Sequence, residues 1–160
     1  MIKKLNGRLI ITECFALFFL IYGVKTIHTA TQSKVYEAII AGESIEGLTD
    51  LTLGEVLTHQ VFWPLGAFFL GVLVLAVINR IYRTSILNTI LIFVVVFSLF
   101  PLGIIFDGFL SQLFNSFCFL FSEKIGTAFY TGGIIITLIS IGLFWRSITL
   151  NKRQSSTSTK

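Results

Sequence analysis

The sequence predicts an all-α integral membrane protein, a bundle of four transmembrane helices with both termini in the cytoplasm and an extra amphipathic helix on the outer side. Its composition is the first reason: 54% of the 160 residues are hydrophobic and 12% are charged, against about 25% charged in a typical soluble domain. The second is that the apolar residues gather into four runs of helical length. The third is that the basic residues lie at alternate ends of those runs.

Each of the four runs is long enough to cross a bilayer, which requires roughly 20 mostly apolar residues in a helix. They cover residues 9–27, 61–81, 86–106 and 128–148. The first run could be mistaken for the apolar core of a signal peptide, because it is preceded by the basic residues Lys3, Lys4 and Arg8. No small-residue cleavage site follows it, however. We therefore expect the first helix to be retained, and residues 1–153 to form a single transmembrane domain.

The distribution of Lys and Arg predicts the orientation. Nine of the twelve basic residues fall before the first run, between the second and third, or at and beyond the end of the fourth, and no acidic residue lies beside them. The positive-inside rule places those segments in the cytoplasm. This pattern predicts the cytoplasmic (inner) membrane of a bacterium, and an organelle membrane of bacterial descent is the alternative.

Two segments on the outer side are expected to carry further structure. The acidic outer loop, residues 28–60, contains a possible short helix over 35–40 ended by Gly42, and a capping box from Thr52 to Glu55 that would start the second span early. Residues 108–122 have apolar side chains at helical spacing but are too few to span. This amphipathic helix lacks the cationic face of a surface-binding helix, so we expect it to pack on its own bundle or on a partner.

The polar segment 154–160 is predicted to be a disordered cytoplasmic tail, because it has no apolar residue to bury. Small residues within the spans predict where helices come closest. Ala67 and Gly71 are four apart in the second span, as are Ala128 and Gly132 in the fourth. Such pairs let helix backbones approach in lipid, within one chain, in a homodimer or against a partner subunit.

Glu13 is the only acidic residue inside a predicted span. A charge at that depth is costly unless it faces protein or water, so it is a functional candidate by default. The same inner level includes Asn79, Arg80, Asn88 and Arg146, and Arg80, Asn88 and Arg146 complete an expected intramembrane polar cluster with Glu13. One interpretation is a structural ion pair of Glu13 with Arg80 or Arg146, and the other is a proton or cation site on a pathway. We favour the structural interpretation, because the later spans lack a chain of polar groups across the membrane.

His28 and His59 flank the first outer loop, where adjacent antiparallel helices could bring them together. A bis-histidine haem, or a metal site shared with Glu55, Asp107 or Glu123, is sterically conceivable. Neither histidine has the spacing of a known ligand motif, so solvated loop histidines are the favoured interpretation. We accordingly expect no cofactor and no metal.

The motifs and charges point away from several functions. Cys14 and Cys118 form no CxxC pair, the hydrolase motif GxSxG is absent, and the basic residues form no patch for nucleic acid. The sequence favours a small non-enzymatic accessory or assembly subunit of a membrane complex, with lipid and a protein subunit or a second copy as partners. The alternatives are a small oligomeric transporter or channel with Glu13 in its pathway, and a membrane redox or lipid-modifying enzyme using His28 and His59.

Overall fold

The computed structural model describes residues 6–82, 84–105 and 107–157, with side chains described for 6–82, 84–98 and 112–152. Its helices are α1 (Gly7–Thr31), α2 (Ser33–Ala41), α3 (Leu53–Ile81), α4 (Ile86–Ile105), α5 (Asp107–Phe119) and α6 (Ile125–Thr157). Within these residues the only β structure is an isolated bridge between Glu46 and Thr49. The all-α prediction is therefore confirmed.

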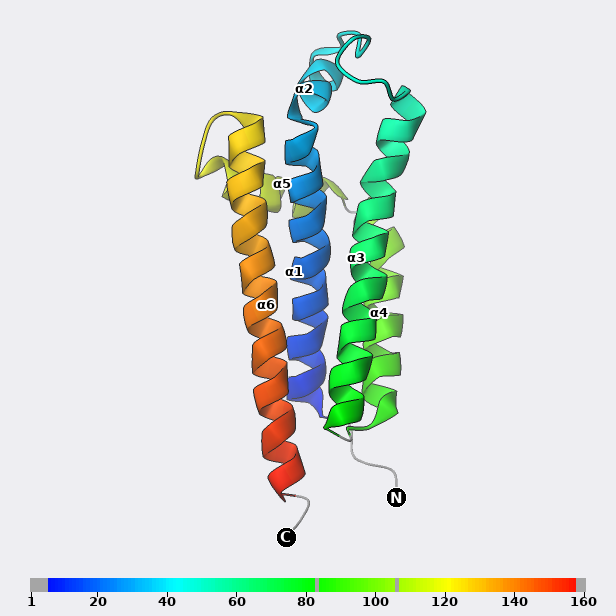
Figure 1. Ribbon diagram of the computed structural model, residues 1–160, viewed down its shortest axis with the longest axis vertical. Coiled ribbons are helices and arrows are strands. Elements are labelled where there is room, and N and C mark those ends of the chain that lie inside the picture. Colours follow the sequence, from blue (N-terminus) through cyan, green and yellow to red (C-terminus); the bar gives the residue numbers. More distant parts are fainter. Residues whose placement is uncertain (1–5, 83, 106, 158–160) are drawn as a thin grey trace.

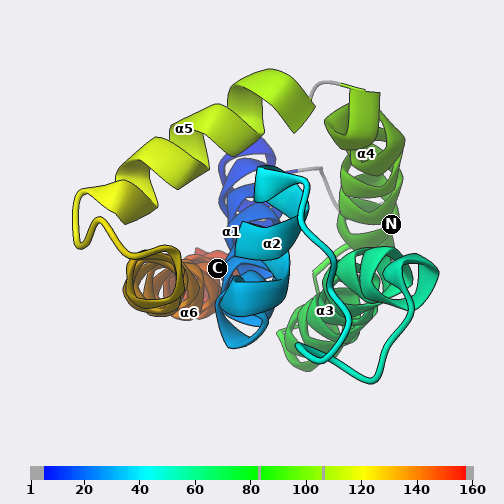
Figure 2. The same cartoon turned by 90° about the horizontal axis from the view of Figure 1, so that it is seen from above.

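The long helices lie side by side along one axis, with α1 between α6 and α3, and α4 beside α3 (Figure 1). Seen from above, α5 crosses the bundle from α4 towards α6 (Figure 2). Because α1 begins and α6 ends at the same end of the bundle (Figure 1), we call this the inner end and the opposite end, which carries α2, the outer end.

Three helices are long and apolar enough to cross a membrane: Gly7–Thr31, Leu53–Ile81 and, within α6, Ile125–Lys152. Many of their large apolar side chains are exposed, among them Leu70, Leu73 and Leu138. Such apolar surfaces suit a lipid environment, because contact with hydrocarbon avoids the free-energy cost of exposing them to water. The predicted third span, 86–106, corresponds to α4, whose described side chains form a shorter apolar stretch, Ile86–Ser98, and residue 106 lies outside the described part.

The segment that joins α1 to α3 at the outer end contains the short helix and the capping box expected from the sequence. Gly42 ends α2 in the left-handed conformation, at a φ of 70°, which glycine adopts without strain. At the start of α3, the Glu55 amide donates to the Thr52 hydroxyl (3.3 Å), and the Thr52 amide donates to a Glu55 carboxylate oxygen (2.8 Å). The predicted capping box is therefore present, and α3 begins eight residues before the apolar run at 61.

Thr52→Ala should lower the unfolding temperature of the detergent-solubilised protein by roughly 2–4 °C, because it removes the hydroxyl that caps α3. Thr58→Ala is the matched control, since the Thr58 hydroxyl donates only to the Gly54 carbonyl within the same helix. Circular dichroism during heating measures both variants. Equal unfolding temperatures for Thr52→Ala and the wild-type chain would contradict a stabilising cap.

The contact between α1 and α6 is the most extensive in the bundle. It relies on Gly23 and Gly133: a Cβ at Gly133 would lie 3.0 Å from the Ile27 nitrogen and 3.2 Å from the Gly23 carbonyl oxygen. Backbone atoms at such distances leave no room for a side chain. Gly23 was not among the small residues singled out in the sequence.

The predicted packing residues lie at other helix contacts. Ala67 is buried on α3, and a Cβ at Gly71 would collide with the Leu17 side chain of α1. Ala128 is buried on α6, and a Cβ at Gly132 would lie 3.0 Å from the Cα of Cys118 on α5. These residues therefore bring α3 to α1 and α6 to α5 within one chain.

The bundle has one open side. Along α1, Phe18, Phe19 and Tyr22 contact the Phe114 ring of α5, and Tyr22 stacks on it at 4.5 Å between centroids. One to three turns nearer the inner end, Ile11 and Phe15 continue this stripe but are 59% and 53% exposed. In the described part of the chain no Cα atom of α4 lies within 8 Å of a Cα atom of α6, and α5 bridges this side.

The inner end departs from the sequence expectation at the C-terminus. α6 continues to Thr157, four residues into the segment predicted as a disordered tail. Residues 158–160 of that segment lie outside the described residues.

Candidate functional site

Glu13 lies at the meeting point of three helices near the inner end. Its side chain is fully buried. One carboxylate oxygen accepts a hydrogen bond from the Ser147 hydroxyl of α6 (2.6 Å), and the other accepts from the Asn79 amide of α3 (3.1 Å). The carboxylate therefore joins α1, α3 and α6 through neutral donors.

Asn79 extends these bonds into a network. Its amide nitrogen also donates to the Thr89 hydroxyl of α4 (3.1 Å), and its side-chain oxygen accepts from the Asn151 amide of α6 (3.2 Å). The Thr84 hydroxyl donates to the Asn79 backbone carbonyl (2.8 Å) and lies 3.2 Å from the side-chain oxygen of Asn151. The inner polar network thus consists of Glu13, Asn79, Thr84, Thr89, Ser147 and Asn151, and it links all four long helices.

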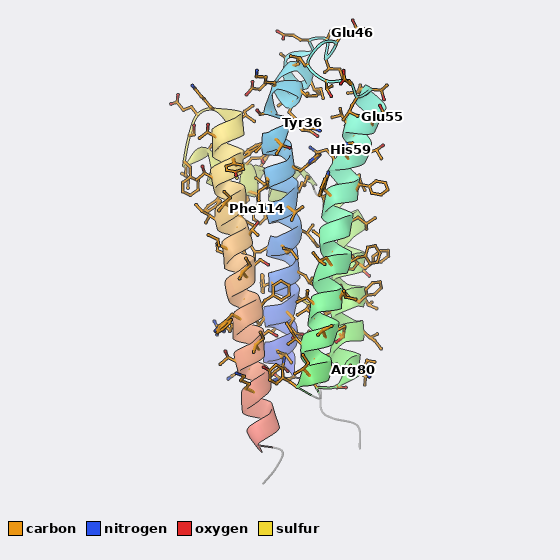
Figure 3. The ribbon with its side chains drawn as sticks, viewed as in Figure 1. Tyr36, Glu46, Glu55, His59, Arg80 and Phe114 are labelled. Carbon is orange, nitrogen blue, oxygen red and sulfur yellow. The ribbon has the colours of Figure 1, made fainter. Side chains whose placement is uncertain are left out.

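The two arginines expected near Glu13 lie elsewhere. Arg80 and Arg146 are exposed, and Arg80 lies at the end of α3 (Figure 3). Each is one residue from a network member, and one residue turns a helix by about 100°. That rotation directs Asn79 and Ser147 to Glu13 in place of the arginines, so the expected ion pair is replaced by neutral hydrogen bonds.

Asn88, the fourth residue of the expected cluster, is buried at the inner end of α4 but stays apart from the network. It is 1% exposed, and neither its side-chain oxygen nor its nitrogen has a hydrogen-bond partner among the described residues. Buried amides are normally satisfied by protein or ordered water, and an unsatisfied group costs about 1–3 kcal/mol.

Asn88→Leu should therefore leave the protein as stable as the wild-type chain or stabilise it by up to about 1 kcal/mol, because an apolar side chain of similar size replaces unpaired polar atoms. Asn79→Leu, the matched change in the network, should destabilise it. Unfolding temperatures in detergent compare the two. A loss of stability in Asn88→Leu equal to that in Asn79→Leu would mean that Asn88 has a partner of its own.

Apolar packing closes the network off from the outer half of the bundle. The core beyond it is formed by Leu17, Ile21, Phe68, Leu75, Ile92 and Val96. Ser140 is the next buried polar residue along α6, and its hydroxyl donates to the Ala16 carbonyl of α1 (2.7 Å). Among the described residues, no polar side chain in this core continues the network outwards.

A second polar cluster lies at the outer end, where α1 and α2 face α3. The His28 and His59 rings have centroids 6.3 Å apart, and the Trp63 ring lies 5.6 Å from His28. The Gln60 amide donates to the Thr29 hydroxyl (3.2 Å) across the same interface. The structure thus brings the two histidines together. Figure 3 labels His59, together with Tyr36 and Glu55, at this end of the bundle.

The acidic residues considered as metal ligands do not complete a site with the histidines. Glu55 is occupied in the capping box, Glu123 is exposed in the turn before α6, and the side chain of Asp107 lies outside the described residues. No group of three His, Cys, Asp or Glu residues in the described part is placed to hold a metal ion.

Three atoms of the outer cluster are buried without a hydrogen-bond partner among the described residues: His28 Nε2, Gln32 Oε1 and the Tyr36 hydroxyl. Burial raises the pKa of Tyr36, an effect that the neighbouring Gln60 side chain partly offsets. The Tyr36 hydroxyl is therefore protonated at neutral pH.

A cavity between α1, α5 and α6 has a volume of about 30 Å³ and is lined by Tyr22, Lys25, Thr26, Thr29, Phe114, Asn115 and Phe129. A water molecule needs roughly 10–15 Å³ measured in this way. Sites for small molecules span about 300–1,000 Å³. The cavity has room for about two water molecules and is too small for an organic substrate.

Comparison with protein-family models, curated proteins and solved structures finds no match to this chain. The class of protein therefore follows from the fold: an all-helical protein with three helices long and apolar enough to cross a membrane. Two groups of polar side chains lie between its described helices, an inner network around Glu13 and an outer cluster around His28 and His59.

Proposed function

We propose that this protein is a non-enzymatic accessory or assembly subunit of a membrane complex. It crosses the cell membrane four times, with α1, α3, α4 and α6 as spans and both termini in the cytoplasm. The observation that carries the proposal is the combination of a closed apolar interior with an open apolar side.

The closed interior argues against a transport or catalytic role. Between the inner polar network and the outer cluster the described helices meet mainly through aliphatic and aromatic side chains, with Phe68 and Leu75 fully buried. The buried Ser140 hydroxyl, which donates to the Ala16 carbonyl, is an isolated polar group in this region. A transport pathway requires a series of polar groups facing the bundle interior. The buried polar groups gather at the two ends instead, where they fix helix positions.

The open side supplies a place for a partner. Ile11 and Phe15 are exposed on α1 where α4 and α6 stand apart, whereas the outer half of the same stripe is covered by α5. A helix of another subunit laid against these two residues would contact α1 and fill the space between α4 and α6. Helices in lipid associate through such close packing, since lipid tails are as apolar as the side chains.

Purification from the native membrane in mild detergent, followed by mass spectrometry, tests this function. We expect a partner in fixed stoichiometry with the wild-type chain and its loss from an Ile11→Ala/Phe15→Ala variant. Leu73→Ala/Val77→Ala is the matched control, because both side chains are exposed on α3. A homogeneous preparation without any partner, or equal recovery of the partner by both double variants, would contradict the proposal.

Cysteine labelling tests the four spans and their orientation. In a chain with Cys14 and Cys118 replaced by alanine, a membrane-impermeant maleimide should label Ser44→Cys in intact cells, and Ser155→Cys only after permeabilisation. Labelling of both positions from the same side would contradict an even number of spans.

A small transporter or channel is the second candidate, favoured by the neutral surroundings of Glu13. A buried carboxyl group held by neutral donors, Ser147 and Asn79 among them, can gain and lose a proton without breaking an ion pair. Proton flux into vesicles containing the purified chain, followed with a pH-sensitive dye, tests this role. Flux that disappears in Glu13→Gln would support transport, and absence of flux in the wild-type chain would exclude proton transport by the chain alone.

A further inference from the structure

The outer cluster brings together the only two histidines of the chain, which are 31 positions apart in sequence. His28 lies near the end of α1 and His59 in the second turn of α3. Their rings face each other at 6.3 Å between centroids and are inclined by 70°. From this juxtaposition we infer that His28 and His59 bind a divalent transition-metal ion at the outer end of the bundle.

The spacing of the rings suits one shared ion. A Zn²⁺–imidazole bond is about 2.0–2.1 Å long, and the ring centre lies about 1.1 Å beyond the nitrogen, so two imidazoles on one ion have centroids roughly 5–6.4 Å apart. The observed separation lies at the upper end of this interval, which corresponds to imidazoles on opposite sides of the ion, so the rings must approach by about 1 Å for the tetrahedral arrangement that Zn²⁺ prefers. Both side chains are half-buried, so small rotations of the rings suffice to direct a nitrogen of each at the ion.

The hydrogen bonding around His28 leaves a position for a ligand. Its Nε2 atom is buried and has no partner among the described residues. The same is true of Gln32 Oε1, at the break between α1 and α2, and of the Tyr36 hydroxyl in the first turn of α2. Three buried polar atoms without a partner are costly unless something binds them. A metal ion with its bound water would satisfy an imidazole nitrogen and two oxygens together.

The donor set indicates the class of ion. Imidazole nitrogens suit Zn²⁺, Cu²⁺ and Ni²⁺, whereas Mg²⁺ and Ca²⁺ prefer oxygen ligands throughout. Because no third His, Cys, Asp or Glu of the described part joins the pair, water and the neutral oxygens of Gln32 and Tyr36 complete the coordination. Such a site exchanges its ion more readily than a structural zinc site with four protein ligands.

The charge of the surrounding segment favours a cation. Between α2 and the first turn of α3 the chain carries exposed carboxylates at Glu43, Glu46, Asp50 and Glu55. Glu46 and Glu55 lie above His59 at the outer end (Figure 3). A concentration of one sign of charge raises the local concentration of the opposite ion. The carboxylates therefore attract the divalent cation towards the two histidines.

Titration of the purified full-length chain with Co²⁺ tests the site, using an affinity tag without histidines. We expect visible absorption bands from one Co²⁺ per chain, which Zn²⁺ displaces and Mg²⁺ does not. His28→Gln and His59→Gln should each weaken binding about 100-fold or more, and Tyr36→Phe about 10-fold. Thr58→Ala is the control, since Thr58 is exposed beside His59 and bonds only within its own helix.

The size-exclusion profile and metal-free unfolding temperature of each variant establish that it is folded. If a histidine variant fails this control, the wild-type chain itself provides the measurement: Zn²⁺ but not Mg²⁺ should raise its unfolding temperature, because an ion that binds the folded state stabilises it. Absence of Co²⁺ bands and of a Zn²⁺ effect in the wild-type chain would overturn the inference. Equal Co²⁺ binding by a folded double histidine variant would identify an adventitious ion only, and would overturn it too.

Discussion

Replacing Glu13 with alanine should destabilise the folded protein by about 3–5 kcal/mol, a large part of the total stability of a typical domain. The change leaves the Ser147 hydroxyl and one Asn79 N–H without their acceptor in a fully buried position. It also opens a cavity where α1, α3 and α6 meet. These losses add, because each group is too deeply buried to find water instead.

Two other variants separate the contributions. Glu13→Gln keeps an acceptor for Ser147 and nearly the same volume, so it should retain much of the stability. Ser140→Ala removes a single hydrogen bond to the Ala16 carbonyl and should cost about 1 kcal/mol. Thermal unfolding in detergent, followed by circular dichroism, ranks the three variants. A Glu13→Ala protein as stable as the wild-type chain would contradict a structural role for the inner polar network.

The position of Glu13 could be predicted from sequence, but its partners could not. A lone acid in an apolar run is visible in the sequence, and charge complementarity makes Arg80 and Arg146 the obvious partners. The choice between residues 79 and 80 depends on the rotation of α3 about its own axis, which hydropathy does not determine. A polar stripe at Ser140, Ser147 and Asn151, spaced seven and four apart on α6, was the signal that could have identified the partners.

The helix boundaries differ from the predicted spans for a related reason. Hydropathy identifies the residues that are stable in the hydrocarbon of a membrane. The ends of a helix depend instead on its backbone hydrogen bonds and on its capping residues. α1 therefore runs to Thr31, beyond the predicted outer limit of 27. α3 starts at Leu53, eight residues before the apolar run at 61, as the predicted capping box indicated. The meeting of His28 and His59 depends on these helical extensions, because they keep both residues on facing helices.

Gly23→Leu should have the other large effect and prevent the bundle from assembling. A Cβ at Gly23 would collide with the Thr137 side chain and lie 3.1 Å from the Thr137 nitrogen and 3.3 Å from the Gly133 carbonyl oxygen. Backbone atoms cannot rotate away as a side chain can, so α1 and α6 would have to separate along their most extensive contact. Overpacking by a few carbon atoms alone costs typically about 1–3 kcal/mol, and four added carbons against backbone should cost more.

Gly66→Leu is the matched control for this prediction. It makes the same chemical change in the middle of α3, where a Cβ would meet nothing within 4 Å. We expect Gly66→Leu to be recovered from membranes and to unfold like the wild-type chain, and Gly23→Leu to be degraded or to aggregate during size-exclusion chromatography. If both variants behaved alike, the close approach of α1 and α6 would not be what holds the fold. A difference between them would come from position alone, because the added side chain is identical and suits lipid equally well in both helices.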